Sequence, residues 1–442
     1  MINGWPAGSL VTRTSRGVEA VLLVVLTVSV LMLATHSSQM WIVAHHSLHL
    51  NVALSLVGFC LFVVATRRVN RAKFYNLLLA ALLGSIYFSY EITGLGDAER
   101  LAFYETNHLR LSELLSNLPY LMVNHLHLPY RLVPPLCGLF TALGYFSLCD
   151  YLFRGADNER QETNKCLYCL FYLASGVHLV FFAGYLESTL TSLPWLVWYI
   201  YFCLRYYHTD SQRPKEAIRN LSGAALCLAL AALFHGQITF LTPALLIVIL
   251  LKRIGKWEIR ALWSDLALAS VIAIGLVVAT YFLLVAVGFD IEAGNIQGGG
   301  DSLRFVPLDP SEVRNRSVRF GMFSVAHFTE VANILAVASP LCVWLWISRM
   351  TWKEDAMKAS RRSDAWCLQL MALGYVSLAF LWNFDLHFPI DYDLMLSMSI
   401  PFHLSVLSFV MSRPHGPTYG ALLWVGGGIT YSWCIMSSFL RY

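Results

Sequence analysis

The chain has few charged residues: Asp, Glu, Lys and Arg together make up only 13% of its 442 residues. Soluble globular domains carry about a quarter of their residues as charges, mostly at the surface. The composition therefore excludes an ordinary soluble globule. The chain also lacks an internal repeat, a low-complexity tract and a stretch with the composition of a soluble domain.

Cysteine pairs are missing from the polar loops. All ten cysteines lie within apolar runs or at their ends. Disulfides that shape an extracytoplasmic face require paired cysteines in the loops of that face. We therefore expect no disulfides there.

The chain is instead rich in apolar residues: 57% of its residues are hydrophobic and 14% are aromatic. A helix needs about 20 apolar residues to cross a hydrocarbon core of about 30 Å. The apolar runs predict an all-α integral membrane protein with about 13 transmembrane helices. The candidate spans are 18–34, 50–66, 74–90, 131–152, 166–185, 192–207, 221–236, 238–251, 266–288, 331–348, 365–382, 394–411 and 419–439.

Basic residues are distributed unevenly between alternate loops. With Arg13 and Arg16 placed inside, the inside loops collect about three quarters of the 31 Lys and Arg residues. Such a bias sets the orientation of membrane proteins. It predicts a multi-pass protein of the plasma (inner) membrane with a cytoplasmic N-terminus and an uncleaved first span.

Three outer segments are longer than a connection requires: residues 91–130, 289–330 and 383–393. Within the first, the helical spacing of apolar residues over 101–128 predicts one or two amphipathic helices in the membrane interface. The second contains a run of three glycines followed by a basic cluster, and the third has the sequence NFDLHFPIDYD.

Two hairpins have basic residues at both ends, so their turns face outward. In residues 221–251 each leg has about 15 residues and would rise only about 22 Å. The tip at His235 is therefore predicted to lie below the outer surface, where irregular backbone lines a cavity or is buried in protein. Glu187 occupies the turn of the other hairpin, 166–207.

Ionisable residues in these outer segments are candidates for chemistry. Asp97 or Glu99 could act as a general base if partial burial raises the pKa, or could be a solvated loop acid. His327 and Glu330 are three residues apart and share one face of a predicted helix. Glu330 could instead be an acid favoured near a helix N-terminus.

Asp385, His387, Asp391 and Asp393 crowd the third outer segment. Asp391 and Asp393 could hold a divalent cation through carboxylate oxygens, or could cap the following helix. Acids and histidines from five outer segments would thus converge on one cavity that opens outward.

Five motifs resemble the GT-C superfamily of polytopic membrane glycosyltransferases, most closely its uncharacterised bacterial members. They are GDAERL (96–101), FFAGYLEST (181–189), FHGQITFLTP (234–243), MFSVAHFTEVANILAVASP (322–340) and FDLHFPIDYDL (384–394). In this family the loop with the catalytic acid follows the first span, whereas here it follows the third. The first two spans would then be an added hairpin.

The resemblance implies transfer of a sugar from a polyprenyl-phosphate donor to a lipid, glycan or protein acceptor at the extracytoplasmic face. It places the catalytic acid at Asp97, with Glu99 as the alternative. Arg100, Arg131 or the cluster of Arg314, Arg316 and Arg319 would neutralise the leaving phosphate. The sugar and acceptor pockets would be lined by Glu187, His235, His327, Glu330, Asp385, His387, Asp391 and Asp393.

We expect an N-terminal hairpin over 1–70, a GT-C-like catalytic module over 71–290 and a C-terminal transmembrane module over 291–442. Membrane lipids are expected partners and nucleic acid is not. Two other functions stay open: a non-catalytic subunit that keeps the fold, and a transporter. A transporter would require polar groups near the bilayer midplane and broken helices in two related halves.

Overall fold

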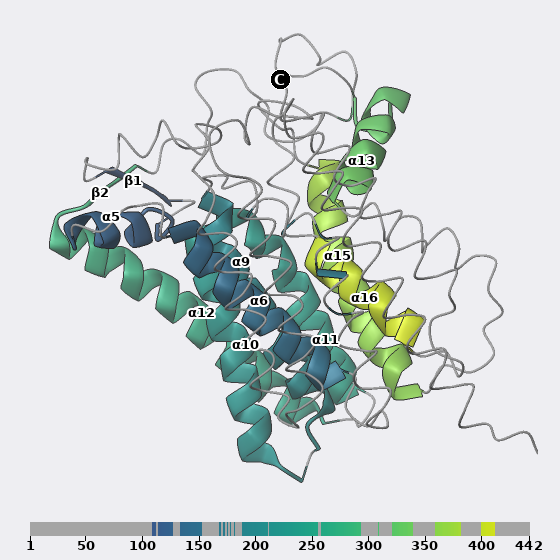
Figure 1. Cartoon of the computed structure of the whole chain (residues 1–442). Coiled ribbons are helices and arrows are strands. Elements are labelled where there is room, and N and C mark those ends of the chain that lie inside the picture. Colours follow the sequence, from purple (N-terminus) through teal and green to yellow (C-terminus); the bar gives the residue numbers. More distant parts are fainter. Residues whose placement is uncertain are drawn as a thin grey trace, which may run out of the picture.

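The computed structural model describes twelve elements of the chain, which form a helix bundle (Figure 1). Helix makes up 88% of the described residues, which agrees with the predicted all-α class. The described residues are 108–111, 114–126, 133–152, 168, 171–172, 175, 177, 181, 188–210, 212–254, 258–292, 308, 321–338, 359–381 and 399–411.

Three helices, α6 (Val133–Leu152), α9 (Ser188–His208) and α10 (Pro214–Phe234), form the centre of the bundle. Helix α9 packs between α6 and α10. Alanine-rich α10 lets neighbouring backbones approach closely, as small residues do in membrane helix pairs. Beside them, the rings of Tyr145, Phe146 and Tyr172 lie 5.1–5.7 Å apart and are fully buried.

Helix α10 ends at an extended residue, His235, and the chain then reverses. A 3₁₀ helix, η5 (Gly236–Leu241), leads directly into α11 (Thr242–Ile254). The turn lies where the sequence predicts it. The predicted length of the first leg is wrong, because α10 begins at Pro214 and its 21 residues rise about 31 Å.

The early start of α10 has a local cause. Pro214 occupies the first helical position, where its fixed φ favours a helix and its missing N–H costs nothing. The charged residues that follow continue the helix beyond the apolar run. Arg219, expected to end the span, lies inside α10. The first leg is therefore long enough to cross the membrane, and its length does not place the tip below the outer surface.

Helix α12 (Ile259–Val287) is the edge of the bundle and is apolar on nearly all sides. Only 6% of its most apolar stretch is buried, compared with 61% for α10. A helix that exposes so many large apolar side chains suits contact with lipid. At 29 residues it is about 43 Å long, so it tilts or extends beyond a 30 Å core.

Three further helices complete the described bundle: α13 (Val325–Ala338), α15 (Ala359–Leu381) and α16 (Ser399–Met411). Helix α15 packs against α16, α13 and η5. Among the described residues, four segments are long and apolar enough to cross a membrane: α10, η5 with α11, α12 and the 364–381 part of α15. This is consistent with a membrane protein.

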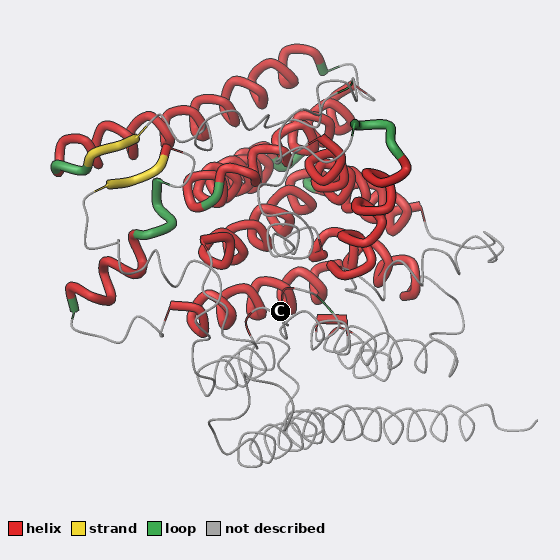
Figure 2. The backbone as a smooth tube through the Cα atoms, turned by 90° about the horizontal axis from the view of Figure 1, so that it is seen from above, coloured by secondary structure: helices red, strands yellow, loops and turns green. Residues whose placement is uncertain are grey.

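The first outer segment contains a strand as well as a helix. Strand β1 (His108–Arg110) pairs in parallel with β2 (Asp290–Glu292), and α5 (Leu118–His125) follows. Figure 2 shows the two strands side by side, in yellow. The predicted helical spacing is therefore wrong at 108–110, where pairing with a distant strand sets the backbone.

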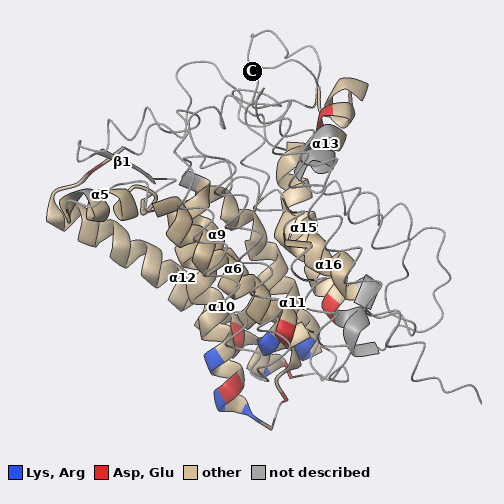
Figure 3. Ribbon diagram, viewed as in Figure 1, with Lys and Arg blue, Asp and Glu red and all other residues tan. Residues whose placement is uncertain are grey.

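The two ends of the bundle differ in charge. Figure 3 shows the Lys and Arg residues gathered where α10 begins and α11 ends, together with several acids. We call this the inner end, after the side that the charge bias predicts, and the opposite end the outer end. Helices α10, α12 and α15 run from the inner end to the outer end, whereas α9 and α11 run the other way (Figure 1).

Candidate functional site

The outer end brings together parts of the predicted site. The backbone N–H of Leu115, in the first outer segment, donates to the carbonyl oxygen of Leu233 at 2.9 Å. Leu233 lies in the last turn of α10, two residues before His235. The first outer segment is thus fixed beside the turn that carries His235.

A small apolar cluster strengthens this joint. Leu109 and Leu114 pack with Leu233 of α10 and Leu284 of α12, and all four are at least 92% buried. The β1–β2 pairing adds three residue pairs, from His108 with Asp290 to Arg110 with Glu292. The start of the second outer segment therefore meets the first at the same end of the bundle.

His235 is buried at this turn, with 6% of its surface exposed. Its backbone N–H donates to Ala231 at 2.9 Å, and its carbonyl accepts from Ile238 at 3.1 Å. The ring of neighbouring Phe234 stacks on Trp195 of α9 at 6.1 Å. An ionisable residue buried at the turn of an otherwise apolar hairpin is a functional candidate.

His327 lies in the first turn of α13, where Ser324 caps the helix. The backbone N–H of His327 donates to Ser324 Oγ at 3.2 Å, as expected for an N-cap serine. Its Nε2 lies 2.8 Å from the carbonyl oxygen of Phe380, near the end of α15. The imidazole is 2% exposed, so this hydrogen bond gives it a structural role between two helices.

Glu330 follows one turn later on α13 and is half-buried. His327 and Val331 are buried on the side of α13 that faces α15, while Phe328 and Thr329 are exposed. Glu330 lies at the edge of this contact. Glu330 as a residue is thus partly exposed at the outer end, whereas His327 is buried.

Helix α15 connects these two parts of the outer end. A Cβ at Gly374 would lie 2.8 Å from the carbonyl oxygen of Phe240 in η5, so the two backbones are in close contact. The 3₁₀ helix after His235 and the start of α13 therefore both pack against the same helix, α15. The remaining predicted site residues are outside the described part of the chain: Asp97, Glu99, Arg100, Glu187, Asp385, His387, Asp391 and Asp393.

The predicted cation site also lies outside the described residues, because it depends on Asp391 and Asp393. Within the described ranges, no three His, Cys, Asp or Glu residues are grouped closely enough to hold a metal ion. The divalent cation therefore stays a prediction for the third outer segment.

The inner end holds a buried network that the sequence did not predict. Asp265 of α12 accepts from Arg253 Nε at 2.7 Å and from the hydroxyl of Tyr206 at 2.5 Å. Arg253 also pairs with Glu258 at 2.5 Å, and the ammonium group of Lys252 donates to the carbonyl oxygens of Tyr206 and, at 3.0 Å, Thr209. These contacts join the inner ends of α9, α11 and α12.

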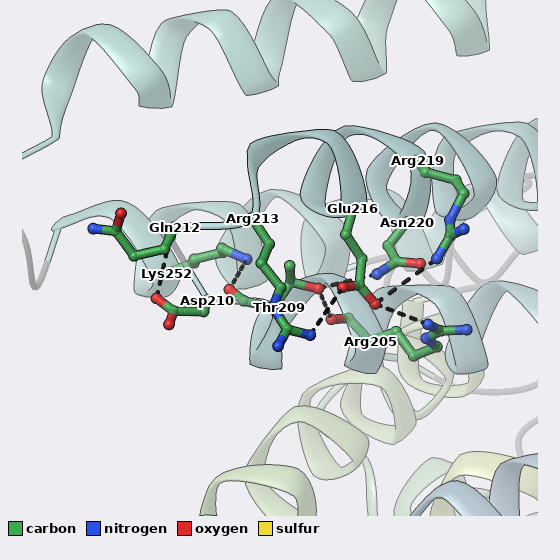
Figure 4. Close-up of polar contacts among 9 residues, drawn as sticks. All are labelled: Arg205, Thr209, Asp210, Gln212, Arg213, Glu216, Arg219, Asn220 and Lys252. Atoms are coloured by element: carbon green, nitrogen blue, oxygen red, sulfur yellow. Dashed lines mark hydrogen bonds and ion pairs between the residues drawn. The ribbon is translucent and has the colours of Figure 1, made fainter.

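A second polar side-chain contact at the inner end links α9 to α15. Nε2 of His208 contacts Oδ1 of Asp364, and the Asp364 side chain is 11% exposed. Around the start of α10, Glu216 pairs with Arg205 at 3.0 Å, and Asn220 donates to Thr209 at 3.0 Å (Figure 4). Charges buried at this end are thus paired, as burial requires.

One signal in the sequence could have revealed part of this network. Opposite charges at the two sides of a short connection between helices can pair, and α11 ends at Ile254 while α12 begins at Ile259. Arg253, in the last turn of α11, and Glu258, the N-cap residue of α12, are such a pair, with Asp265 two turns further along the chain. The contacts of Tyr206 and of His208 with residues more than 50 positions away depend on the packing of the bundle and have no local signal.

Comparison of the chain with protein-family models, with curated proteins and with solved structures finds no match.

Proposed function

We propose that this protein is a membrane glycosyltransferase that moves a sugar from a polyprenyl-phosphate donor to an acceptor at its outer end. The observation that carries the proposal is that two of the three long outer segments, the first and the second, lie at the same end of the bundle as the turn at His235. The first segment bonds to the turn at His235, β2 pairs with β1, and α13 packs on the end of α15. The five motifs that resemble the GT-C superfamily support the chemistry.

In the proposed reaction, Asp97 removes the proton from an acceptor hydroxyl, with Glu99 as the alternative base. The hydroxyl oxygen then attacks the anomeric carbon of the sugar, and the bond to polyprenyl phosphate breaks. A guanidinium group such as that of Arg100 would stabilise the leaving phosphate, because its planar fork matches phosphate oxygens. Glu330 and His235 would contribute to the walls around sugar and acceptor.

Asp97→Asn tests the proposal, because the amide keeps the size of the side chain but cannot act as a base. We expect turnover to fall on the order of 100-fold or more. The assay measures consumption of lipid-linked sugar, over a panel of donors, in membranes with matched expression. Asp210→Asn, an equivalent change at the inner end, is the control and should retain wild-type turnover.

Two outcomes would contradict the assignment. Wild-type turnover by Asp97→Asn would remove Asp97 as the base and shift the role to Glu99. If the wild type itself consumes no donor from the panel, the non-catalytic subunit becomes the better account.

A further inference from the structure

The end of α9, the connection after it and the first turns of α10 carry a group of charged side chains that we call the α10 basic cluster: Arg205, Arg213, Lys215 and Arg219, with Asp210 and Glu216. Three of these guanidinium groups surround the single carboxylate of Glu216, with N–O distances of 3.0 Å for Arg205, 3.7 Å for Arg213 and 3.8 Å for Arg219. Figure 4 shows them converging on Glu216 from the end of α9 and the start of α10.

The charges of this cluster do not balance. Four cations face two carboxylates, which leaves an excess of two positive charges. Arg213 and Arg219 lie beyond ordinary hydrogen-bond distance from Glu216, and their side chains are 74% and 67% exposed. Both can therefore offer N–H donors to an anion while Glu216 keeps them close together.

The helix terminus adds to this positive potential. Arg213 is the N-cap residue of α10, and its side chain does not cap the helix. The N-terminus of a 21-residue helix carries a partial positive charge that attracts anions. The cluster and the helix terminus thus favour the same ligand, a group with negatively charged oxygens.

An exposed apolar strip continues from the cluster along α10. Ile218 is 51% exposed and Leu226 is 41% exposed. They follow Lys215 by 3 and 11 residues, which places all three on one side of the helix. A ligand that fits both parts has an anionic head and a hydrocarbon tail.

We propose that the α10 basic cluster binds the headgroup phosphate of an anionic phospholipid, whose acyl chains lie along the exposed side of α10. Arg213 and Arg219 hold the phosphate oxygens, and Ile218 and Leu226 contact the first part of the chains. Anionic lipid on the cytoplasmic side of the membrane is attracted to such groups of basic residues. This lipid site is separate from the proposed catalytic end.

The test compares purified wild-type protein with the double variant Arg213→Gln and Arg219→Gln. Each is mixed with phosphatidylglycerol or phosphatidylcholine in detergent, and bound lipid is counted by native mass spectrometry. We expect the wild type to prefer phosphatidylglycerol, and the double variant to bind it about 30-fold more weakly, since each of the two basic residues adds about 1 kcal/mol. Lys215→Gln should show a smaller loss.

Arg260→Gln is the matched control, because Arg260 is an exposed arginine at the start of the neighbouring helix α12. It should bind phosphatidylglycerol as the wild type does. An equal loss with Arg260→Gln would show diffuse attraction and overturn the site. Equal binding of phosphatidylcholine, unchanged binding by the double variant, or complete displacement of the lipid by millimolar inorganic phosphate would each overturn it too.

Discussion

The two ends of the bundle are held together by different interactions. At the inner end, ion pairs and side-chain hydrogen bonds join the helices, such as Arg253 with Asp265 and His208 with Asp364. At the outer end, backbone hydrogen bonds and leucine contacts join the segments, as in the β1–β2 pairing. The ion pairs that connect two described residues all lie at the inner end.

This difference suggests a division of roles. The buried ionisable groups at the inner end, such as Asp265 and Arg253, pair with one another, so their removal should affect mainly stability. At the outer end, the contacts that join the described segments are made by backbone groups, leucines and the imidazole of His327, and the proposed catalysis lies at this end. Variants at the inner end should therefore lower stability with little effect on catalysis, and variants at the outer end should also change turnover.

The largest effect on stability is expected for Asp265→Asn at the inner end. The change removes the carboxylate between Arg253 and Tyr206, and the Arg253 side chain is only 12% exposed. Breaking a buried pair leaves an uncompensated charge, at a cost of about 3 kcal/mol. Unfolding by SDS in mixed micelles measures this loss.

Glu258→Gln is the control for this prediction. The side chain of Glu258, the other partner of Arg253, is 31% exposed, so its loss should cost less than about 1 kcal/mol. An equal cost for the two variants would refute the central role of Asp265.

An intermediate effect is expected for Gly374→Ala, which tests the packing of α15 on η5. The new Cβ would lie 2.8 Å from the carbonyl oxygen of Phe240 and force the backbones apart. We expect a loss of about 2 kcal/mol and lower turnover, since η5 follows His235. Gly275→Ala in α12 meets no atom within 4 Å and should gain up to about 1 kcal/mol from helix propensity. Equal results for the two would contradict the observed contact.

The smallest effect is expected at the joint between α12 and β2. Gly288 ends α12 in the left-handed conformation, with φ of 99°, and its N–H bonds to the last turn. Gly288→Ala should cost about 1 kcal/mol and weaken the β1–β2 pairing, measured by hydrogen exchange at residues 290–292. Gly288→Asn should cost less, because asparagine tolerates this conformation. A larger loss for Gly288→Asn than for Gly288→Ala would show that the size of the side chain, and not the backbone conformation, limits this position.

The sequence predicted the central helices well because their signal is local. Apolar runs placed spans at 131–152, 192–207 and 266–288, and the structure has α6, α9 and α12 there with earlier or nearly equal starts. The turn at His235 was also found. The starts of α10 and α12 were missed because charged residues extend both helices beyond the apolar run.

The parts that the sequence did not predict depend on distant partners. Strand β1 forms because β2, about 180 residues later, supplies its hydrogen bonds. The leucines that follow it, at 111, 114, 115 and 118, have the spacing of a helix when taken alone. The inner network likewise pairs Tyr206 with Asp265, and His208 with Asp364, across different helices. Of the predicted site, the structure describes His235, His327 and Glu330, and it gives His327 a structural partner.

Whether the two ends of the bundle face opposite sides of the membrane can be measured by the accessibility of single introduced cysteines from each side. Met122 of α5 and Val325 of α13 are 56% and 82% exposed at the outer end, and Arg213 is exposed at the inner end. A membrane-impermeant maleimide is added to intact cells or to inside-out vesicles, with the unaltered chain as background. We expect Met122→Cys and Val325→Cys to react only in cells and Arg213→Cys only in vesicles. Reaction of all three from the same side would contradict the account.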